Sequence, residues 1–474
     1  MIWSIAWKNI WRNKSRSLVI LIAIALGLMA GVFSVGWMMG MIEQRINNSI
    51  HNELAHLQIH NPKFLQNEEI NLSIKDPLQV KKSLKDLPEV KSFSSRLKIN
   101  GMANTPSGNT GVTIYGVHPK QEKEVFDLHE HIISETGAFL DEEPSNKIVI
   151  GEKLAENLNI IRYKLTGESL NKLEEKDVPD KILKSLDTLK GKLFRDEGDF
   201  KETLEEIIGK KKTKKFFRII KSSSKDYKTR SKIVLTMQDK EGNLTGGAFR
   251  IAGIYSISNT AFEGRYVFIH HSDLSRITNL DENSSHEMAI LLKEREMGPG
   301  VKKKLEEIFP EKSIRLWKNI QPDLAMTTEY VEISYYVIII FILLALGFGI
   351  VNTMLMAVLE RIKELGMLMA IGMNKSRIFM MILLETVYLT LTGAALGMLL
   401  GYLLIAITSN TGIDLTNYAE GFQALGYSAV IYPKINFTFF LGVTGMVIAT
   451  GILSSIYPAI KALKLNPVEA TRTE

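Results

Sequence analysis

Four long apolar windows constrain this chain more than any other feature of its sequence. They are Leu18–Met41, Ile333–Leu359, Ile378–Ile407 and Ile435–Ile456. A helix rises about 1.5 Å per residue and the hydrocarbon core of a bilayer is about 30 Å thick, so each window is long enough to cross it. We therefore expect a membrane protein with four transmembrane helices. The first window is too long for a signal peptide, so we expect it to be retained as an anchor.

The windows divide the chain into alternating membrane and water-exposed parts. A long charged region of 43–332 separates the first window from the second. The expected order is an amphipathic elbow helix (1–17), transmembrane helix 1 (18–42), a large domain (43–332), helix 2 (333–359), a helical turn (360–377), helix 3 (378–407), a loop (408–434), helix 4 (435–458) and a tail (459–474).

Basic residues predict the orientation in the membrane. They gather before the first window, in the 360–377 turn and in the tail, whereas the 408–434 loop has only Lys434. Because cytoplasmic loops are enriched in Lys and Arg, both termini and the turn are expected in the cytoplasm, with the 43–332 domain outside. We predict a multi-pass membrane protein with both termini inside and its large domain on the outer side.

The outer domain has the pattern of an α+β fold. Strand-like alternation occurs at 54–60, 92–101, 110–117, 147–151, 232–238, 249–256, 265–270 and 287–293. Helical stretches at Asp76–Leu87, Glu152–Asn159 and Val301–Ile308 lie between them. Such mixing predicts a mixed sheet with helices packed on it.

The segment 161–231 differs from its surroundings and reads as a helical, basic insert. The run GKKKTKKFFRIIKSSSKDYKTRSK begins within it at Gly209 and ends at Lys232. A nucleic-acid surface is a poor interpretation on the outer side of a membrane. A solvated face, or attraction to anionic lipid or glycan, fits better, and no nucleic-acid partner is expected.

Two sets of residues point to membrane packing. Trp3, Trp7 and Trp11 fall on one helical face beside basic residues, which favours the headgroup layer at the inner surface. Gly393, Gly397 and Gly401 recur every fourth residue and predict a flat strip for close helix packing.

The turn between the second and third windows has an amphipathic character. Ile362, Leu365 and Met369 repeat at helical spacing beside the charged residues Glu360, Arg361, Lys363 and Glu364. The pattern fits a bare hairpin between two spans or a helix with a further task.

Catalytic chemistry is sparse. The chain has no cysteine and 9 scattered histidines, with no HExxH pattern, so no metal site is expected. It has no GxSxG motif and no GxxxxGK[ST] phosphate loop, so we expect no catalytic residues and no cofactor of its own. Glu385 lies in the third window, and we favour a side chain that reaches the inner interface or bonds a hydroxyl such as that of Thr386 over a place in an ion path.

Several stretches resemble one family. ERIKELGMLMAIGM (360–373) resembles the turn of FtsX/MacB-type ABC transporter permeases. YPAIKALKLNPVEA (457–470) resembles their ending, and AWKNIWRNKSRS (6–17) their N-terminal elbow. Within the family, HLQIHNPKF (56–64) and IVIGEKLAENLNI (148–160) are most like the lipoprotein-releasing subunits of the LolC/LolE type. The insert after Ile160 departs from that type.

The resemblance implies a fold, a mechanism and partners. The outer domain would be MacB periplasmic core-like, and two permease subunits, identical or paralogous, would pair. A cytoplasmic ABC ATPase dimer would bind ATP and Mg, dock on the turn and drive the outer domains mechanically, without a path through the bilayer. The ATPase-coupling residues implied are Glu360, Arg361, Lys363, Glu364, Leu365, Gly366, Met369, Gly372 and Met373.

Three functions stay open at this level. The first is extraction of a lipoprotein or another amphiphile from the outer leaflet of the inner membrane. The second is MacB-like efflux of peptides or drugs with a periplasmic adaptor. The third is an FtsX-like relay that activates cell-wall hydrolases. All three make the chain a non-catalytic subunit.

Overall fold

The computed structural model describes residues 2–175 and 178–464, which form two compact units. The helical unit comprises Met1–Gln44, Asp323–Leu415 and Val430–Glu474, and the sheet unit comprises Arg45–Pro322 and Thr416–Ala429. Of the tail predicted at 459–474, residues 465–474 lie outside the described residues.

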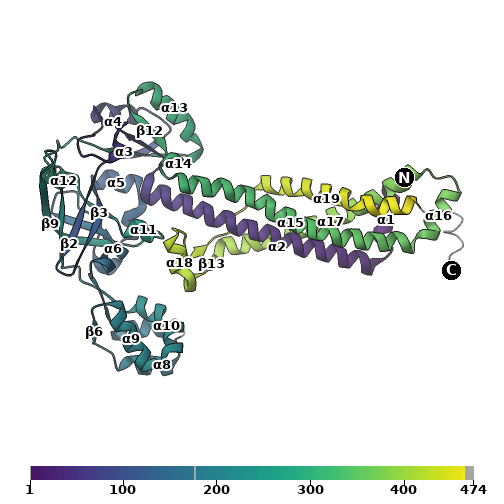
Figure 1. Ribbon diagram of the computed structural model, residues 1–474, viewed down its shortest axis with the longest axis horizontal. Coiled ribbons are helices and arrows are strands. Elements are labelled where there is room, and N and C mark those ends of the chain that lie inside the picture. Colours follow the sequence, from purple (N-terminus) through teal and green to yellow (C-terminus); the bar gives the residue numbers. More distant parts are fainter. Residues whose placement is uncertain (1, 176–177, 465–474) are drawn as a thin grey trace. The chain divides into compact units, whose positions relative to one another are not determined.

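Four long helices run side by side in the helical unit (Figure 1). They are α2 (Lys14–Ser49), α15 (Pro322–Glu360), α17 (Lys375–Thr411) and α19 (Phe437–Leu463). Among the described residues these are the helices long and apolar enough to cross a membrane, so the structure has four candidate spans at the places that hydropathy predicts. The π-helix η1 (Ile50–Leu54) continues α2 into the sheet unit.

Shorter elements complete the helical unit. They are α1 (Ile2–Ile10), α16 (Ile362–Ala370) and the paired strands β13 (Ile413–Asp414) and β14 (Val430–Ile431). The N-terminal element predicted over 1–17 is shorter than expected, because α2 already begins at Lys14.

Glycines bring α2 and α17 together. A Cβ on Gly397 would lie 2.6 Å from the carbonyl oxygen of Ala25. A Cβ on Gly393 or Gly401 would lie 2.9 Å from the Cβ atom of Ile24 or Val32, respectively. The three predicted packing glycines therefore let two helices approach to backbone contact.

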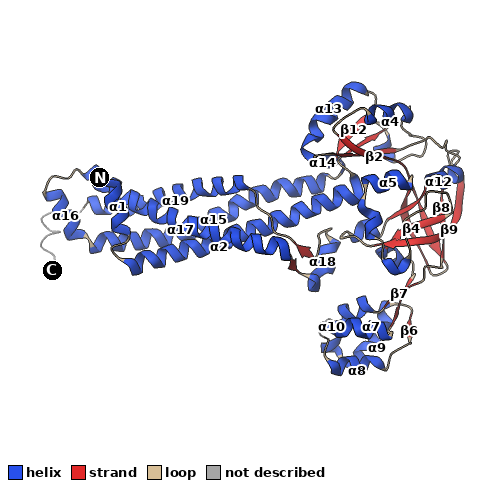
Figure 2. Cartoon of the chain, turned by 180° about the vertical axis from the view of Figure 1, so that it is seen from behind, coloured by secondary structure: helices blue, strands red, loops and turns tan. Residues whose placement is uncertain are grey.

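A nine-stranded mixed sheet builds the sheet unit (Figure 2, red). The strand order is β12-β1-β11-β2-β3-β10-β4-β9-β8, with β10 parallel to β3, β4 parallel to β9 and the other pairs antiparallel. The strands are β1 (Leu57–His60), β2 (Val90–Thr105), β3 (Gly108–Val117), β4 (Lys147–Gly151), β8 (Lys232–Gln238), β9 (Leu244–Tyr255), β10 (Tyr266–His270), β11 (Glu287–Leu292) and β12 (Ser313–Leu316).

The long strand β2 closes part of this sheet into a ring. Its first half pairs with β11 and its second half with β3, and residues 101–104 also pair with β8. Gly101 permits that closure, since a Cβ there would lie 2.6 Å from the carbonyl oxygen of Thr236. The apolar faces of the ring strands form a core with residues such as Leu97, Ile114 and Val267.

Short helices connect and cover the strands. They are α3 (Phe64–Asn67), α4 (Pro77–Lys85), α5 (Pro119–Val125), α6 (Glu152–Asn157), α11 (Thr260–Glu263), α12 (His271–Thr278), α13 (Gly298–Ile308), α14 (Trp317–Ile320) and α18 (Ala419–Ala424). The expected α+β domain is thus present. The loop predicted at 408–434 contributes α18 to this unit, where the Thr260 hydroxyl donates to the Gln423 carbonyl over 3.4 Å.

The segment predicted as a helical insert also contains a small sheet. Its helices are α7 (Gly167–Glu174), α8 (Asp180–Asp187), α9 (Glu197–Ile208) and α10 (Lys210–Ser223). Its strands β5 (Ile161–Lys164), β6 (Leu193–Phe194) and β7 (Lys225–Tyr227) pair in the order β6-β5-β7. Buried Leu173, Leu186, Phe200 and Ile220 belong to its core, so the insert packs around apolar side chains of its own.

Candidate functional site

The turn between α15 and α17 is a short helix held between two sharp changes of direction. After α15 ends at Glu360, α16 runs from Ile362 to Ala370. Gly372 then takes a φ of +95°, a conformation that side chains disfavour. The Asn374 side chain accepts a hydrogen bond from the Ser376 amide over 3.1 Å and caps α17. Together these residues set the position of α16.

One face of α16 packs against its own chain. Leu365 is only 3% exposed and Gly366 is also buried. Met369 and Met373 are partly buried against the same core of the helical unit. The resemblance implies Leu365 as an ATPase-coupling residue, and in this structure its side chain lies inside the helical unit rather than on its surface.

The opposite face of α16 is open and largely apolar. Met367 is 57% exposed and Ile371, directly after the helix, is 78% exposed. Lys363 and Ala370 are exposed beside them. We call Lys363, Met367, Ala370 and Ile371 the outer face of α16. Sequence periodicity finds an apolar stripe on this helix, but only the packing shows which residues point outward.

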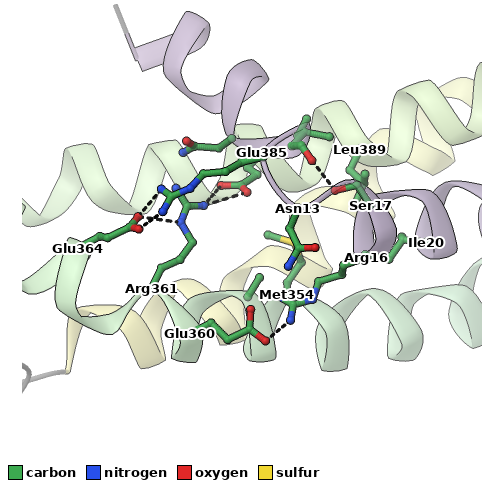
Figure 3. A pocket seen from close by; sticks show the side chains of 14 residues that line it. Asn13, Arg16, Ser17, Ile20, Met354, Glu360, Arg361, Glu364, Glu385 and Leu389 are labelled. Atoms are coloured by element: carbon green, nitrogen blue, oxygen red, sulfur yellow. Dashed lines mark hydrogen bonds and ion pairs between the residues drawn. The ribbon is translucent and has the colours of Figure 1, made fainter. Parts of the chain in front are cut away.

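The charged residues of the turn pair with arginines from the start of the chain (Figure 3). Arg12 lies in the link between α1 and α2, and its Nη1 atom donates to Glu364 Oε2 over 2.7 Å. Arg16, in the first turn of α2, forms an ion pair with Glu360. The hydrogen bond from Arg12 holds the pKa of Glu364 below its usual value.

A third arginine links the turn to α17. Arg361 Nε lies 3.3 Å from Glu364 Oε2, and Arg361 Nη1 lies 3.2 Å from Glu385 Oε1. Glu385 is buried, and its partner is this arginine rather than the hydroxyl of Thr386, which donates to the Ile382 carbonyl. A carboxylate in an apolar helix is costly without a partner, so Arg361 accounts for Glu385 at this position.

These side chains surround a cavity of about 270 Å³. Its charged lining consists of Arg12, Arg16, Arg361, Glu360, Glu364 and Glu385. Since the six charges pair with one another, the arrangement is a network of ion pairs that ties α16 to α2, α15 and α17. Sequence reasoning missed Arg12, Arg16 and Glu385 as members, because their partners are distant in the sequence.

The predicted interface tryptophans lie on and just after α1. The rings of Trp3 and Trp7 lie 6.4 and 5.7 Å from that of Tyr388 in α17, and the rings of Trp7 and Trp11 are 6.1 Å apart. All three tryptophans remain more than 40% exposed. The glycines at 393, 397 and 401 take no part in the ion-pair network and lie along the α2–α17 contact instead.

Two family models match the chain. The FtsX-like permease C-terminal model matches residues 336–467, and the MacB-like periplasmic core domain model matches residues 17–171.

Curated relatives match parts of the chain. The macrolide export ATP-binding/permease protein MacB of Chlorobium luteolum is 33% identical over 162 residues, which is 34% of this chain and 22% of that protein. The uncharacterized ABC transporter permease YknZ of Bacillus subtilis is 33% identical over 132 residues, which is 28% of this chain and 29% of that protein. The alignments therefore span less than a third of either relative.

Two solved structures also match, at low similarity. The extracellular domain of the noncanonic ABC-type transporter YknZ from Gram-positive bacteria is 10% identical with a TM-score of 0.29, covering 55% of this chain and 98% of that chain. The periplasmic region of MacB from Actinobacillus actinomycetemcomitans is 7% identical with a TM-score of 0.28, covering 61% of this chain and 95% of that chain.

The sequence matches carry the assignment. One model covers nearly all of the last three candidate spans, and the other covers the first span and the start of the sheet unit. Over residues 17–171 and 336–467 the chain is therefore similar to FtsX/MacB-type ABC transporter permeases.

Proposed function

We propose that this chain is the permease subunit of an ABC transporter and passes the motion of a separate ATPase to its own sheet unit. The observation that carries the proposal is the structure of α16, whose outer face is exposed while its inner face and charges are tied to the long helices. ATP and Mg are bound by the ATPase, and this subunit performs no catalysis.

The outer face of α16 suits a contact with another protein. Exposed methionine and isoleucine side chains give adaptable apolar contacts, and Lys363 adds a charge at the edge. This face replaces the Leu365 side of the helix in the docking role that the resemblance implied.

The ion pairs give a path for force out of α16. Glu360 ends α15 and pairs with Arg16 at the beginning of α2. Both helices join the sheet unit through the chain itself, since α2 continues into η1 and α15 follows α14. A movement of α16 therefore displaces two helices that lead directly to the other unit.

The proposed orientation places both termini and α16 in the cytoplasm and the sheet unit outside a bacterial inner membrane. Its support is the distribution of basic residues along the sequence. A second copy, or a paralogue, completes the transporter, together with membrane lipid and an ATPase dimer.

For the substrate we propose a lipoprotein or another amphiphile, taken from the outer leaflet of the inner membrane. The support is the resemblance of 56–64 and 148–160 to lipoprotein-releasing subunits. A second candidate is efflux of peptides or drugs with a periplasmic adaptor, which the curated relatives named for macrolide export favour.

Reconstitution separates these functions. The chain is purified from its native membrane with its bound proteins and placed in proteoliposomes with a fluorescent acylated peptide or a macrolide. We expect an ABC ATPase in the complex, vanadate-sensitive hydrolysis, and ATP-dependent release of the peptide. Macrolide transport without peptide release would favour the second candidate. A complex that contains no ATPase and hydrolyses no ATP would contradict the transporter role.

A further inference from the structure

The insert at 161–231 accounts for the positive charge of the chain. It contains 20 Lys and Arg against 13 Asp and Glu, a formal net charge of +7, while the whole chain has +6. The rest of the chain therefore has a net charge of −1, even though basic residues flank its spans. The coupling mechanism makes no use of this charge.

Helix α10 concentrates the charge on one face. It has seven cationic residues and no acidic residue between Lys210 and Ser223. Five of the lysines are exposed, and no ion pair of the described residues includes any of them: Lys210, Lys211, Lys212, Lys214 and Lys215. We call these five residues the lysine face.

The other face of α10 packs into the core of the insert. Thr213 and Ile220 are fully buried, and Phe216 and Phe217 pack against the same core. The lysine face is thereby fixed toward solvent, and the aromatic rings are turned inward rather than free to enter a membrane.

The lysines are unfavourable for the helix itself. Lys210, Lys211 and Lys212 occupy its first turn, where positive charge opposes the helix dipole, and the neighbouring lysines repel one another. Gly209 precedes the helix and provides no side-chain cap. The stability of the insert therefore does not explain why these lysines occur in the first turn of α10. A local residue choice that disfavours the helix in which it lies is typical of a functional surface.

We propose that the lysine face docks on a bilayer surface rich in anionic lipid headgroups. Lysine ammonium groups act as point charges without fixed hydrogen-bond geometry, which suits mobile lipid phosphates. Clusters of this size are enough to bind anionic lipid, and a protein with four candidate spans always has a bilayer as a neighbour. Docking is electrostatic, since Phe216 and Phe217 are partly buried against the core of the insert.

Vesicle binding tests the proposal on the full chain. The protein is held in nanodiscs of zwitterionic lipid, and its binding to vesicles is measured by flotation. Vesicles with about 30% phosphatidylglycerol should bind at low salt and lose binding above about 0.15 M salt, while pure phosphatidylcholine vesicles should not bind. The triple variant Lys211→Gln, Lys214→Gln and Lys215→Gln should bind about 100-fold more weakly, since each lysine contributes roughly fivefold.

Two matched variants separate the lysine face from charge and folding in general. Lys82→Gln, Lys120→Gln and Lys240→Gln remove the same charge from exposed lysines outside the insert that form no ion pair among the described residues, and this variant should leave binding unchanged. The triple variant Lys211→Arg, Lys214→Arg and Lys215→Arg should retain vesicle binding. Equal losses of binding in the two glutamine variants would overturn the proposal. Wild-type binding by the glutamine variant at Lys211, Lys214 and Lys215 would also overturn it. Binding to soluble polyphosphate but not to the anionic vesicles would also overturn it.

Discussion

Arg12 and Glu364 are 352 positions apart in the sequence, yet Arg12 Nη1 donates to Glu364 Oε2 over 2.7 Å. The pair joins the N-terminal link to the helix that we propose as the ATPase contact. Both side chains are largely exposed to solvent, so the pair contributes little to stability. Its importance lies in the connection that it makes between α16 and the link that precedes α2.

Reversal of the charges tests that connection. Arg12→Glu or Glu364→Arg alone should reduce ATP-driven transport several-fold, because two like charges then repel across the contact. The double variant should recover most of the activity, since the attraction is restored with opposite polarity. Lys461→Glu is the control, since Lys461 is exposed in α19 and forms no ion pair with any residue that the structure describes. A double variant as impaired as either single one would show that the pair has no role.

The Arg361–Glu385 pair should contribute to the stability of the folded helical unit. Arg361→Met leaves the buried carboxylate of Glu385 without its guanidinium partner, and we expect a loss of about 2 kcal/mol in unfolding free energy. Adding Glu385→Met should restore part of the loss, because the unpaired charge is removed. Thermal unfolding in detergent measures both. If the losses in unfolding free energy of Arg361→Met and Glu385→Met simply add in the double variant, the two side chains do not stabilise each other and this prediction is wrong.

Close packing of α2 and α17 predicts a difference between two glycines. Gly397→Ala places a methyl group 2.6 Å from the Ala25 carbonyl oxygen and should destabilise the helical unit by about 1–3 kcal/mol. Gly445→Ala in α19 adds a Cβ that meets no described atom within 4 Å. It should instead stabilise the helix by up to about 1 kcal/mol. Similar melting temperatures for the two variants would refute the packing role of Gly397.

Glu263 predicts how the stability of the sheet unit depends on pH. Its side chain is 4% exposed, and burial raises its pKa to about 8, assisted by the nearby Glu152 and opposed by the Ile257 amide and Lys225. The folded state therefore binds a proton that the unfolded state, with a pKa of 4.5, releases. Stability from this group is complete below about pH 4.5 and is lost as pH rises through about 8.

Glu263→Gln should remove that dependence. The variant should unfold at a more nearly constant temperature between pH 5 and 8, and above pH 8 it should be more stable than the wild type. Glu152 does not obscure the result, since burial raises its pKa but Lys225, Tyr227 and Ser256 hold it below the ordinary value overall, so its effect falls at lower pH. Parallel pH profiles for the two proteins would rule out a proton on Glu263.

Local patterns are enough to predict many elements of this fold. The spans follow from apolar runs alone, and strands such as 110–117 and 147–151 follow from alternation and β-branched residues. These features depend on neighbours in the sequence, so one chain suffices to recognise them.

Features that depend on distant partners are absent from such patterns. The pairing of β2 with β8 joins Gly101 to Met237, and no local signal marks it. The ion pairs of Arg12 and Arg16 cross more than 340 positions. On α16 the helical period identifies two stripes, but the packing of Leu365 against the long helices decides which stripe is exposed.

ATPase stimulation by variants of the outer face of α16 tests the central claim most directly. Met367→Glu and Ile371→Glu place charges at exposed apolar sites, and Leu78→Glu makes the same change at a 62% exposed site in the sheet unit. We predict that the first two abolish co-purification and stimulation of the ATPase, while Leu78→Glu preserves both. Wild-type stimulation by a folded Met367→Glu, Ile371→Glu double variant would contradict the account.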